Sequence, residues 1–174
     1  MKAAARWLLL SLFALSLAGC GYHSVGAATH LPQGTRTLAV PVFAIRTTNN
    51  HTETIMTEAV VREFLTRTRL RVVPSSDAAA DAVLHGTILS QTVVPLTYNS
   101  QTQESSSFLI TIVVAVKLTA QDGRLLYSND NYVFRQQYQS TTDLTTYLEE
   151  DPAAVARLSR DFARALVADI LESF

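Results

Sequence analysis

Residues 108–118 alternate between two sides of an extended chain, and this pattern constrains the fold more than any other feature. One side carries only large apolar residues: Phe108, Ile110, Ile112, Val114, Val116 and Leu118. Because successive side chains of a β-strand point to opposite faces of a sheet, this row predicts a strand with one buried face. The other side includes Thr111 and Lys117, which suits a more polar face.

A turn signal follows this strand. Asp122 and Gly123 are typical of a tight β-hairpin, so residues 125–138 are predicted to pair antiparallel with residues 108–118. Before residues 108–118 in the sequence, residues 95–107 are polar and contain almost no apolar residues. They predict a long hairpin loop or a ragged strand end.

Two more strands precede this hairpin. Residues 82–94 alternate and predict a second main strand. Residues 36–45 also alternate, but Pro41 lacks a backbone N–H, which favours an edge or bulged strand. Residues 70–73 predict only a short extended piece.

A first helix is predicted between these strands. Asn50 suits the N-cap and Glu53 lies three residues on, where it suits both a reciprocal hydrogen bond and the helix dipole. The helix is expected to end near Thr68. Its inner face contains Met56, Val60 and Phe64, broadened by Ile55, Ala59 and Leu65.

A second helix is predicted at the end of the chain. Asp151 suits an N-cap and Pro152 the first helical position, where its missing N–H costs nothing. The helix continues almost to Phe174, with an apolar stripe at every fourth residue: Leu158, Phe162, Leu166 and Ile170.

The order of these elements is β-α-β-β-β-α, which predicts an α+β fold. We expect a two-layer sandwich with a mainly antiparallel four-stranded sheet and both helices on one face. The other face would be more polar and available for contacts.

The N-terminus has the three parts of a secretory signal. Lys2 and Arg6 are followed by an eleven-residue apolar run at residues 7–17 and by Leu-Ala-Gly-Cys at residues 17–20. The run is too short to span a bilayer as a helix. We expect cleavage before Cys20, whose thiol would carry a diacylglyceryl group and whose freed amine a further acyl chain.

The chain divides on this basis into three parts. Residues 1–19 are the signal peptide, residues 20–35 the lipidated cysteine with a short tether, and residues 36–174 a single α+β domain. Cys20 is the only cysteine, so the domain has no internal disulfide. The tether reaches roughly 20 Å, which keeps the domain near its membrane.

Charge and motifs restrict the possible functions. Loss of Lys2 and Arg6 takes the net charge from −1 to −3, which disfavours nucleic-acid binding. The four histidines, His23, His30, His51 and His85, lack the spacing of a metal site, and no catalytic motif is visible. We therefore expect no enzymatic activity, no metal and no cofactor beyond the covalent lipid on Cys20.

Three basic residues lie on or beside the predicted hairpin: Lys117, Arg124 and Arg135. A cation there would suit a lipid phosphate or a carboxylate. The same residues also fit ordinary solvated charges of a strand.

Several segments together resemble the LptE family of outer-membrane lipopolysaccharide-assembly lipoproteins. They are Leu-Ala-Gly-Cys-Gly-Tyr at residues 17–22, Leu-Ala-Val-Pro-Val-Phe at residues 38–43, Ala-Asp-Ala-Val-Leu-His-Gly-Thr at residues 80–87, the strand at residues 126–138, and Glu-Glu-Asp-Pro-Ala at residues 149–153. The resemblance extends over nearly the whole mature chain.

This resemblance implies a non-catalytic role. Such a lipoprotein would sit as a plug in an LptD-type outer-membrane β-barrel, help it to assemble and help to deliver lipopolysaccharide to the outer leaflet. Gly21 after the anchor cysteine implies sorting to the outer membrane, with the domain on the periplasmic side or inside the barrel. Lys117 and Arg135 are the candidate lipopolysaccharide-binding residues.

A second function also fits the anchor and the α+β domain. The chain could be a lipoprotein adaptor or activator of a periplasmic cell-wall enzyme. That role would need a long tether, whereas the segment at residues 21–35 is short.

Overall fold

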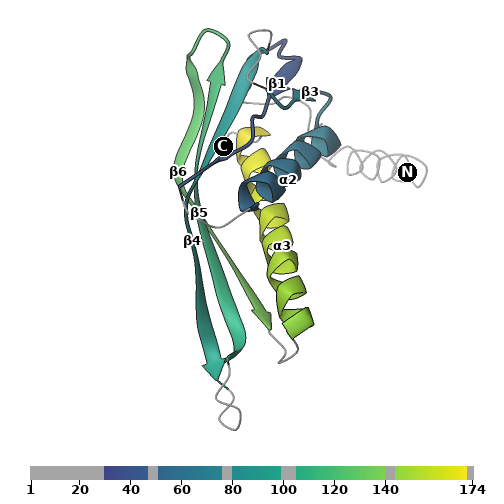
Figure 1. Cartoon of the computed structure of the whole chain (residues 1–174). Helices are drawn as coiled ribbons and strands as arrows, with labels where there is room; N and C mark the ends of the chain where they lie inside the picture. Colours follow the sequence, from purple (N-terminus) through teal and green to yellow (C-terminus); the bar gives the residue numbers. More distant parts are fainter. Residues whose placement is uncertain (1–29, 47–50, 76–79, 99–104, 140–143, 172–174) are drawn as a thin grey trace, which may run out of the picture.

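The computed structural model of the chain describes residues 30–46, 51–75, 80–98, 105–139 and 144–171. The elements in chain order are β1 (Thr37–Ala39), β2 (Ala44–Ile45), α2 (Thr52–Arg67), β3 (Arg71–Val73), β4 (Ala82–Tyr98), β5 (Ser105–Ala120), β6 (Leu125–Gln139) and α3 (Leu144–Leu171). Figure 1 shows one curved sheet with α2 and α3 packed on the same face. The predicted α+β class and the two helices on one face are confirmed.

The sheet itself differs from the prediction. It has six strands in the order β3-β1-β4-β5-β6, with β2 paired to β4, rather than four. The pairs β1 with β3, β1 with β4 and β2 with β4 are parallel, so the sheet is mixed. The predicted antiparallel part is the β4-β5-β6 meander. The prediction of a mainly antiparallel four-stranded sheet was therefore wrong in its N-terminal part.

The predicted strand at residues 36–45 is divided because its middle leaves the ladder. Pro41 has no N–H to donate, and the Phe43 N–H donates instead to Thr57 Oγ1 of α2 at 3.0 Å. The predicted alternation of side chains between two faces also ends here, because Val42 is 59% exposed whereas Phe43 is buried. The short extended piece at residues 70–73 becomes β3, which pairs with β1 after the α2 crossover.

The hairpin of β5 and β6 forms as predicted. Gly123 adopts a φ of 83°, which glycine reaches without steric cost, and Asp122 Oδ1 accepts the Arg124 N–H at 2.9 Å. The polar segment at residues 95–107, predicted as a long hairpin loop or a ragged strand end, is strand at both ends, because β4 extends to Tyr98 and β5 begins at Ser105. Thr97 and Ser107 hydroxyls bond across the two strands at 2.7 Å.

Both predicted helix starts need correction. The N-cap of α2 is His51, in a left-handed conformation with φ of 72° and no side-chain capping bond, and Asn50 lies outside the described residues. Helix α3 begins at Leu144, so Asp151 and Pro152 lie inside it rather than at its start. The residues before Asp151 include Leu148, Glu149 and Glu150, which favour helix and extend it backwards.

The core lies between the buried sheet face and the two helices. From α2 it receives Met56, Val60 and Phe64, all without exposed surface, as predicted; Leu65, in contrast, is 56% exposed. The β5 row from Ile110 to Leu118 is buried as the alternation requires. At the centre, the Phe162 ring of α3 meets three rings edge-on: Phe43, Tyr132 and Phe134.

Candidate functional site

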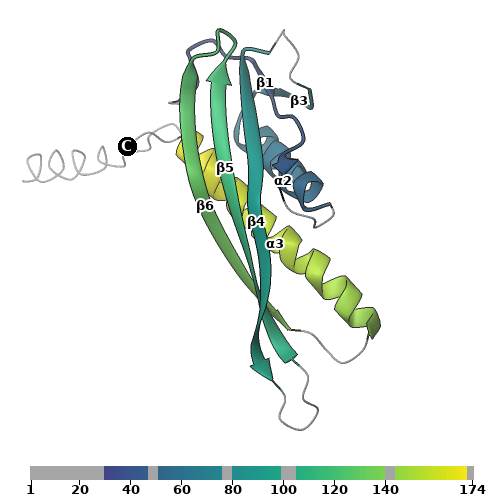
Figure 2. The ribbon, with the colours of Figure 1, turned by 60° about the vertical axis from the view of Figure 1, so that its left-hand side comes forward.

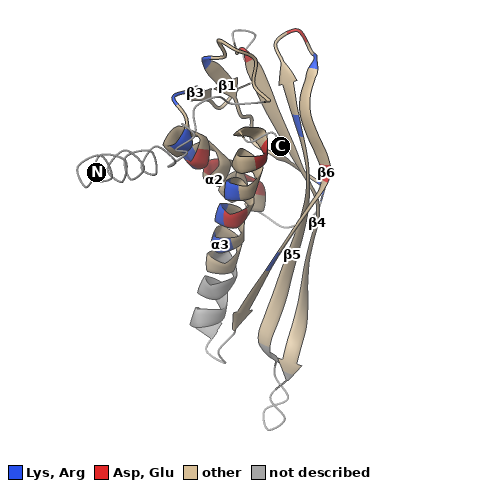
Figure 3. Ribbon diagram, turned by 180° about the vertical axis from the view of Figure 1, so that it is seen from behind, with Lys and Arg blue, Asp and Glu red and all other residues tan. Residues whose placement is uncertain are grey.

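The open face of the sheet is the first candidate surface. In Figure 2 the helices of the described part lie behind strands β4, β5 and β6, which leaves the front of these strands uncovered. The even-numbered residues of β5 from Ile110 to Leu118 are buried and face the helices. The odd-numbered residues between them therefore face outwards. Figure 3 shows that these three strands carry few charges.

Lys117 lies on this open face and is exposed. Its register partners are His85 on β4 and Ser128 on β6. It borders a shallow depression of about 320 Å³, whose lining also includes Arg46 and Asp130. Two cations beside one carboxylate leave a modest positive balance that suits a small anionic group.

Arg135 lies on the same face but not in the same place. It pairs with Thr111, six residues along β5 from Lys117, which corresponds to roughly 20 Å at the rise of a strand. The structure thus places both predicted residues on one face without bringing them together. Arg124 lies in the β5–β6 turn beside Asp122, at 3.8 Å.

Apolar side chains lie between the two cations. Val113 and Val133, which are register partners, lie between them, whereas the pair Val94 and Leu109 lies beyond the Thr111–Arg135 pair on the same face. Val133 is 38% and Val94 46% exposed. The open face therefore combines separated cations with exposed apolar groups, which suits an amphipathic ligand or partner.

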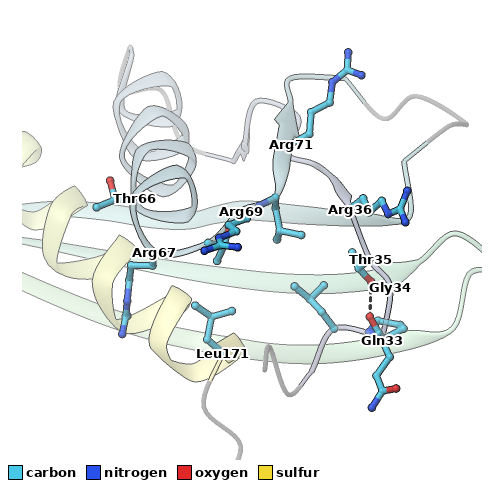
Figure 4. A pocket seen from close by; sticks show the side chains of 13 residues that line it. Gln33, Gly34, Thr35, Arg36, Thr66, Arg67, Arg69, Arg71 and Leu171 are labelled. Atoms are coloured by element: carbon cyan, nitrogen blue, oxygen red, sulfur yellow. Dashed lines mark hydrogen bonds between the residues drawn. The ribbon is translucent and has the colours of Figure 1, made fainter. Parts of the chain in front are cut away.

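A second surface, which the sequence did not predict, is an open depression of about 1100 Å³ beside β3, the strand at one edge of the sheet. Figure 4 shows four arginines on its rim: Arg36, Arg67, Arg69 and Arg71. The alternation of arginines at residues 67, 69 and 71 is the sequence signal that could have pointed to it. Arg36 is brought in only by the pairing of β1 with β3.

A hydrogen-bonded group joins β6 to the end of α3. Tyr132 donates to Asp169, and the Tyr127 and Tyr132 hydroxyls bond to each other. Burial, and then the hydrogen bond to Asp169, raise the pKa of Tyr132 above its ordinary value, so the phenol stays protonated. The group has a structural role, because it fixes the register between the helix and the sheet.

The other predicted site residues fall into two groups. Cys20, the predicted lipid-bearing residue, and His23 lie outside the described residues. His30, His51 and His85 belong to separate segments, and within the described ranges no three His, Cys, Asp or Glu side chains gather as metal ligands would. Of the helices described, neither is sufficiently long and apolar to cross a membrane.

Solved structures share this fold at low sequence identity. A candidate lipoprotein from Caulobacter crescentus is 13% identical, with a TM-score of 0.56 over 75% of this chain and 88% of that one. Lipoprotein B from Nitrosomonas europaea is 14% identical, with a TM-score of 0.55 over 86% and 90%. The hypothetical protein CT253 from Chlamydia trachomatis is 11% identical, with a TM-score of 0.50 over 79% and 98%. At these identities the likeness concerns the fold alone.

The sequence itself matches one family. No curated protein matches the chain significantly. The family described as LptE, lipopolysaccharide-assembly, matches residues 35–170. This range contains every described strand and all but the last residue of α3. Because the match covers well over half of the chain, the protein belongs to the LptE family of lipopolysaccharide-assembly proteins.

Proposed function

We propose that this protein is a non-catalytic outer-membrane lipoprotein that plugs an LptD-type β-barrel, assists its assembly and helps to deliver lipopolysaccharide to the outer leaflet. Lipid on Cys20 holds it to the membrane. The observation that carries the proposal is the family match over residues 35–170. The Leu-Ala-Gly-Cys sequence at residues 17–20 supports the anchor.

The shape of the domain supports the role of a plug. Strands β4, β5 and β6 contain 17, 16 and 15 residues, so each extends for roughly 50 Å. A barrel lumen is polar and lined by side chains. The open face offers it a long surface with few charges and with hydroxyl, amide and small apolar side chains.

Lys117 and Arg135 remain the proposed lipopolysaccharide contacts. Both are exposed, and the side chains between them are largely apolar or uncharged. Because roughly 20 Å separates them, one phosphate cannot bind both. Each cation would meet a different anionic group, so the effects of replacing them should add.

Affinity capture from the native envelope tests the proposal. The tagged chain is extracted in mild detergent, and the partners that copurify at stoichiometric yield are identified. A large outer-membrane β-barrel as the major partner is the expected result. A cell-wall synthase or hydrolase in its place would favour the adaptor function, and the absence of any barrel would contradict the plug.

Variants separate the anchor from the lipopolysaccharide contacts. Cys20→Ala should leave the domain folded but remove it from washed membranes unless the barrel retains it. Lys117→Glu and Arg135→Glu should each weaken binding of purified protein to lipopolysaccharide. Arg160→Glu, an exposed position on α3, is the control with the same change of charge. Equal loss in all three charge variants would indicate a nonspecific charge effect.

A further inference from the structure

The depression with the four arginines lies where the chain enters the domain. Residues 31–36 form one wall, the end of α2 and the start of β3 form another, and Leu171 of α3 completes it. Cys20 precedes Leu31 by eleven residues. Even fully extended, a segment of that length reaches only about 39 Å. A lipid on Cys20 therefore keeps this end of the domain close to the membrane surface.

The lining of this depression is positively charged. It contains four arginines and no acidic residue. Glu63 lies 4.0 Å from Arg67, and the Asp81 carboxylate accepts the backbone N–H groups of Arg36 and Thr37. Within the described part of the chain, no carboxylate lies within ion-pair distance of Arg69 or Arg71. Figure 3 shows this concentration of positive charge at the end of α2 and in β3.

The directions of the side chains distinguish a surface contact from a pocket for one ion. In Figure 4, Arg67 lies on the side of Leu171, whereas Arg36 and Arg71 point away from it. Four guanidinium groups that diverge cannot chelate a single phosphate. They can each meet a different headgroup on an anionic surface, and Leu31, Leu70 and Leu171 line the same depression.

We propose that this arginine surface, formed by Arg36, Arg67, Arg69 and Arg71, docks on the anionic phospholipid headgroups of the membrane that holds the anchor. The docking orients the domain relative to the membrane. The open sheet face, at the other side of the same sheet, then stays directed away from the lipid and accessible to a protein partner. The inference rests on the lipid anchor of the proposed function, so its test must distinguish failure of the anchor from failure of the arginine surface.

The test uses the full chain, isolated from membranes with its lipid and reconstituted into two kinds of vesicle, with a third kind that contains lipopolysaccharide as a comparison. The first kind contains phosphatidylcholine alone, and the second contains phosphatidylcholine mixed with phosphatidylglycerol. Gln33→Cys, at an exposed position on the rim, introduces a thiol for a fluorescent label. Energy transfer from this label to a dye on lipid headgroups then reports how close the arginine surface lies to the membrane.

Energy transfer should be stronger on vesicles with phosphatidylglycerol than on neutral ones, and high salt should abolish the difference. Each arginine near an anionic surface contributes a factor of about five. Arg69→Glu with Arg71→Glu should therefore lower the equilibrium constant for docking at least about 25-fold, and the transfer should fall accordingly. Arg160→Glu with Arg164→Glu, at two exposed positions of α3, changes the charge equally outside the arginine surface and should leave the transfer unchanged.

The outcomes separate the two proposals. Flotation with neutral vesicles tests the anchor alone. Flotation with anionic vesicles only would refute the anchor while supporting the arginine surface, and flotation with neither would refute both. Equal transfer on both kinds of vesicle, or equal loss in both double variants, would overturn the arginine surface. So would a response to vesicles with lipopolysaccharide but not to those with phosphatidylglycerol.

Discussion

Gly86 of β4 lies directly beneath the ring of Phe43, and this contact gives the sharpest prediction. A Cβ added at residue 86 would lie 2.4 Å from the Cδ2 and Cε2 atoms of that ring. Carbon atoms in proteins do not approach so closely, so Gly86→Ala must displace the ring. Phe43 is only 2% exposed and touches Phe162 edge-on at a centroid distance of 6.1 Å. The ring therefore has no free space nearby.

The expected cost follows from three contributions. Overpacking of a core costs about 1–3 kcal/mol, and a contact this short calls for the upper end of that range. Displacing Phe43 from Phe162 adds about 0.5–1.5 kcal/mol. Replacing a glycine within a strand returns about 0.5–1 kcal/mol, because alanine loses less backbone entropy. Gly86→Ala should thus lower the free energy of unfolding by about 3 kcal/mol.

Urea unfolding followed by circular dichroism measures this change directly. A loss of about 3 kcal/mol corresponds to a fall in Tm of roughly 6–12 °C for a chain of this size. Phe43→Leu gives the matched control, because a smaller side chain leaves room for the new methyl group. The double variant should lose less stability than the sum of the two single variants. Strict additivity, or a loss below about 1 kcal/mol for Gly86→Ala, would refute the packing argument.

Three other changes test the core, the helix–sheet junction and the start of β1. Phe162→Ala removes the ring at the centre of the aromatic cluster and should cost about 3–5 kcal/mol in urea unfolding. Tyr132→Phe removes the hydrogen bond to Asp169 and should cost about 1 kcal/mol in the same assay. Backbone hydrogen bonds, first that from Arg36, lower the pKa of Asp81 below its ordinary 3.8. The ionised carboxylate therefore stabilises the fold at pH values above the ordinary pKa, and this contribution is lost as the pH falls through the lowered pKa. In Asp81→Asn, the free energy of unfolding measured against pH should decline less over this acidic range.

The parts of the fold that sequence predicted well are those set by local rules. The alternation at residues 108–118, the Asp122–Gly123 turn and the stripe at Met56, Val60 and Phe64 each specify a face or a turn from neighbouring residues alone. The structure contains all three. Periodicity of this kind survives because burial of one face is required whatever the partner element is.

The errors arise where a distant contact decides the local structure. The strand at residues 36–45 breaks because the Phe43 N–H bonds to Thr57 and its ring packs over Gly86. Nothing near Phe43 in the sequence indicates either partner. The start of α3 is a separate case, because Pro152 suits the first turn of a helix and so favours a start at Asp151, whereas the helix begins at Leu144.

The candidate site divides in the same way. The alternation placed Lys117 on an open face, and the structure agrees. It could not show that Lys117 and Arg135 lie roughly 20 Å apart, because that separation depends on the register of β5 against β6. The arginine surface needed the parallel pairing of β1 with β3, which joins segments on either side of α2.

The position of β1 inside the sheet also determines when the N-terminal part of the domain can form. Strands β4, β5 and β6 each pair with their neighbour in the chain, and such local pairings form early. β1 is made first, yet its hydrogen-bonding partners, β3 and β4, both come later. As the chain is synthesised, Leu38 and Ala39 can pair with Val72 and Val73 of β3, but their other side stays without its strand partner until Ala82 and Val83 are available. The N-terminal strand can thus take its full place in the sheet only after β4, which serves as its template, has been made.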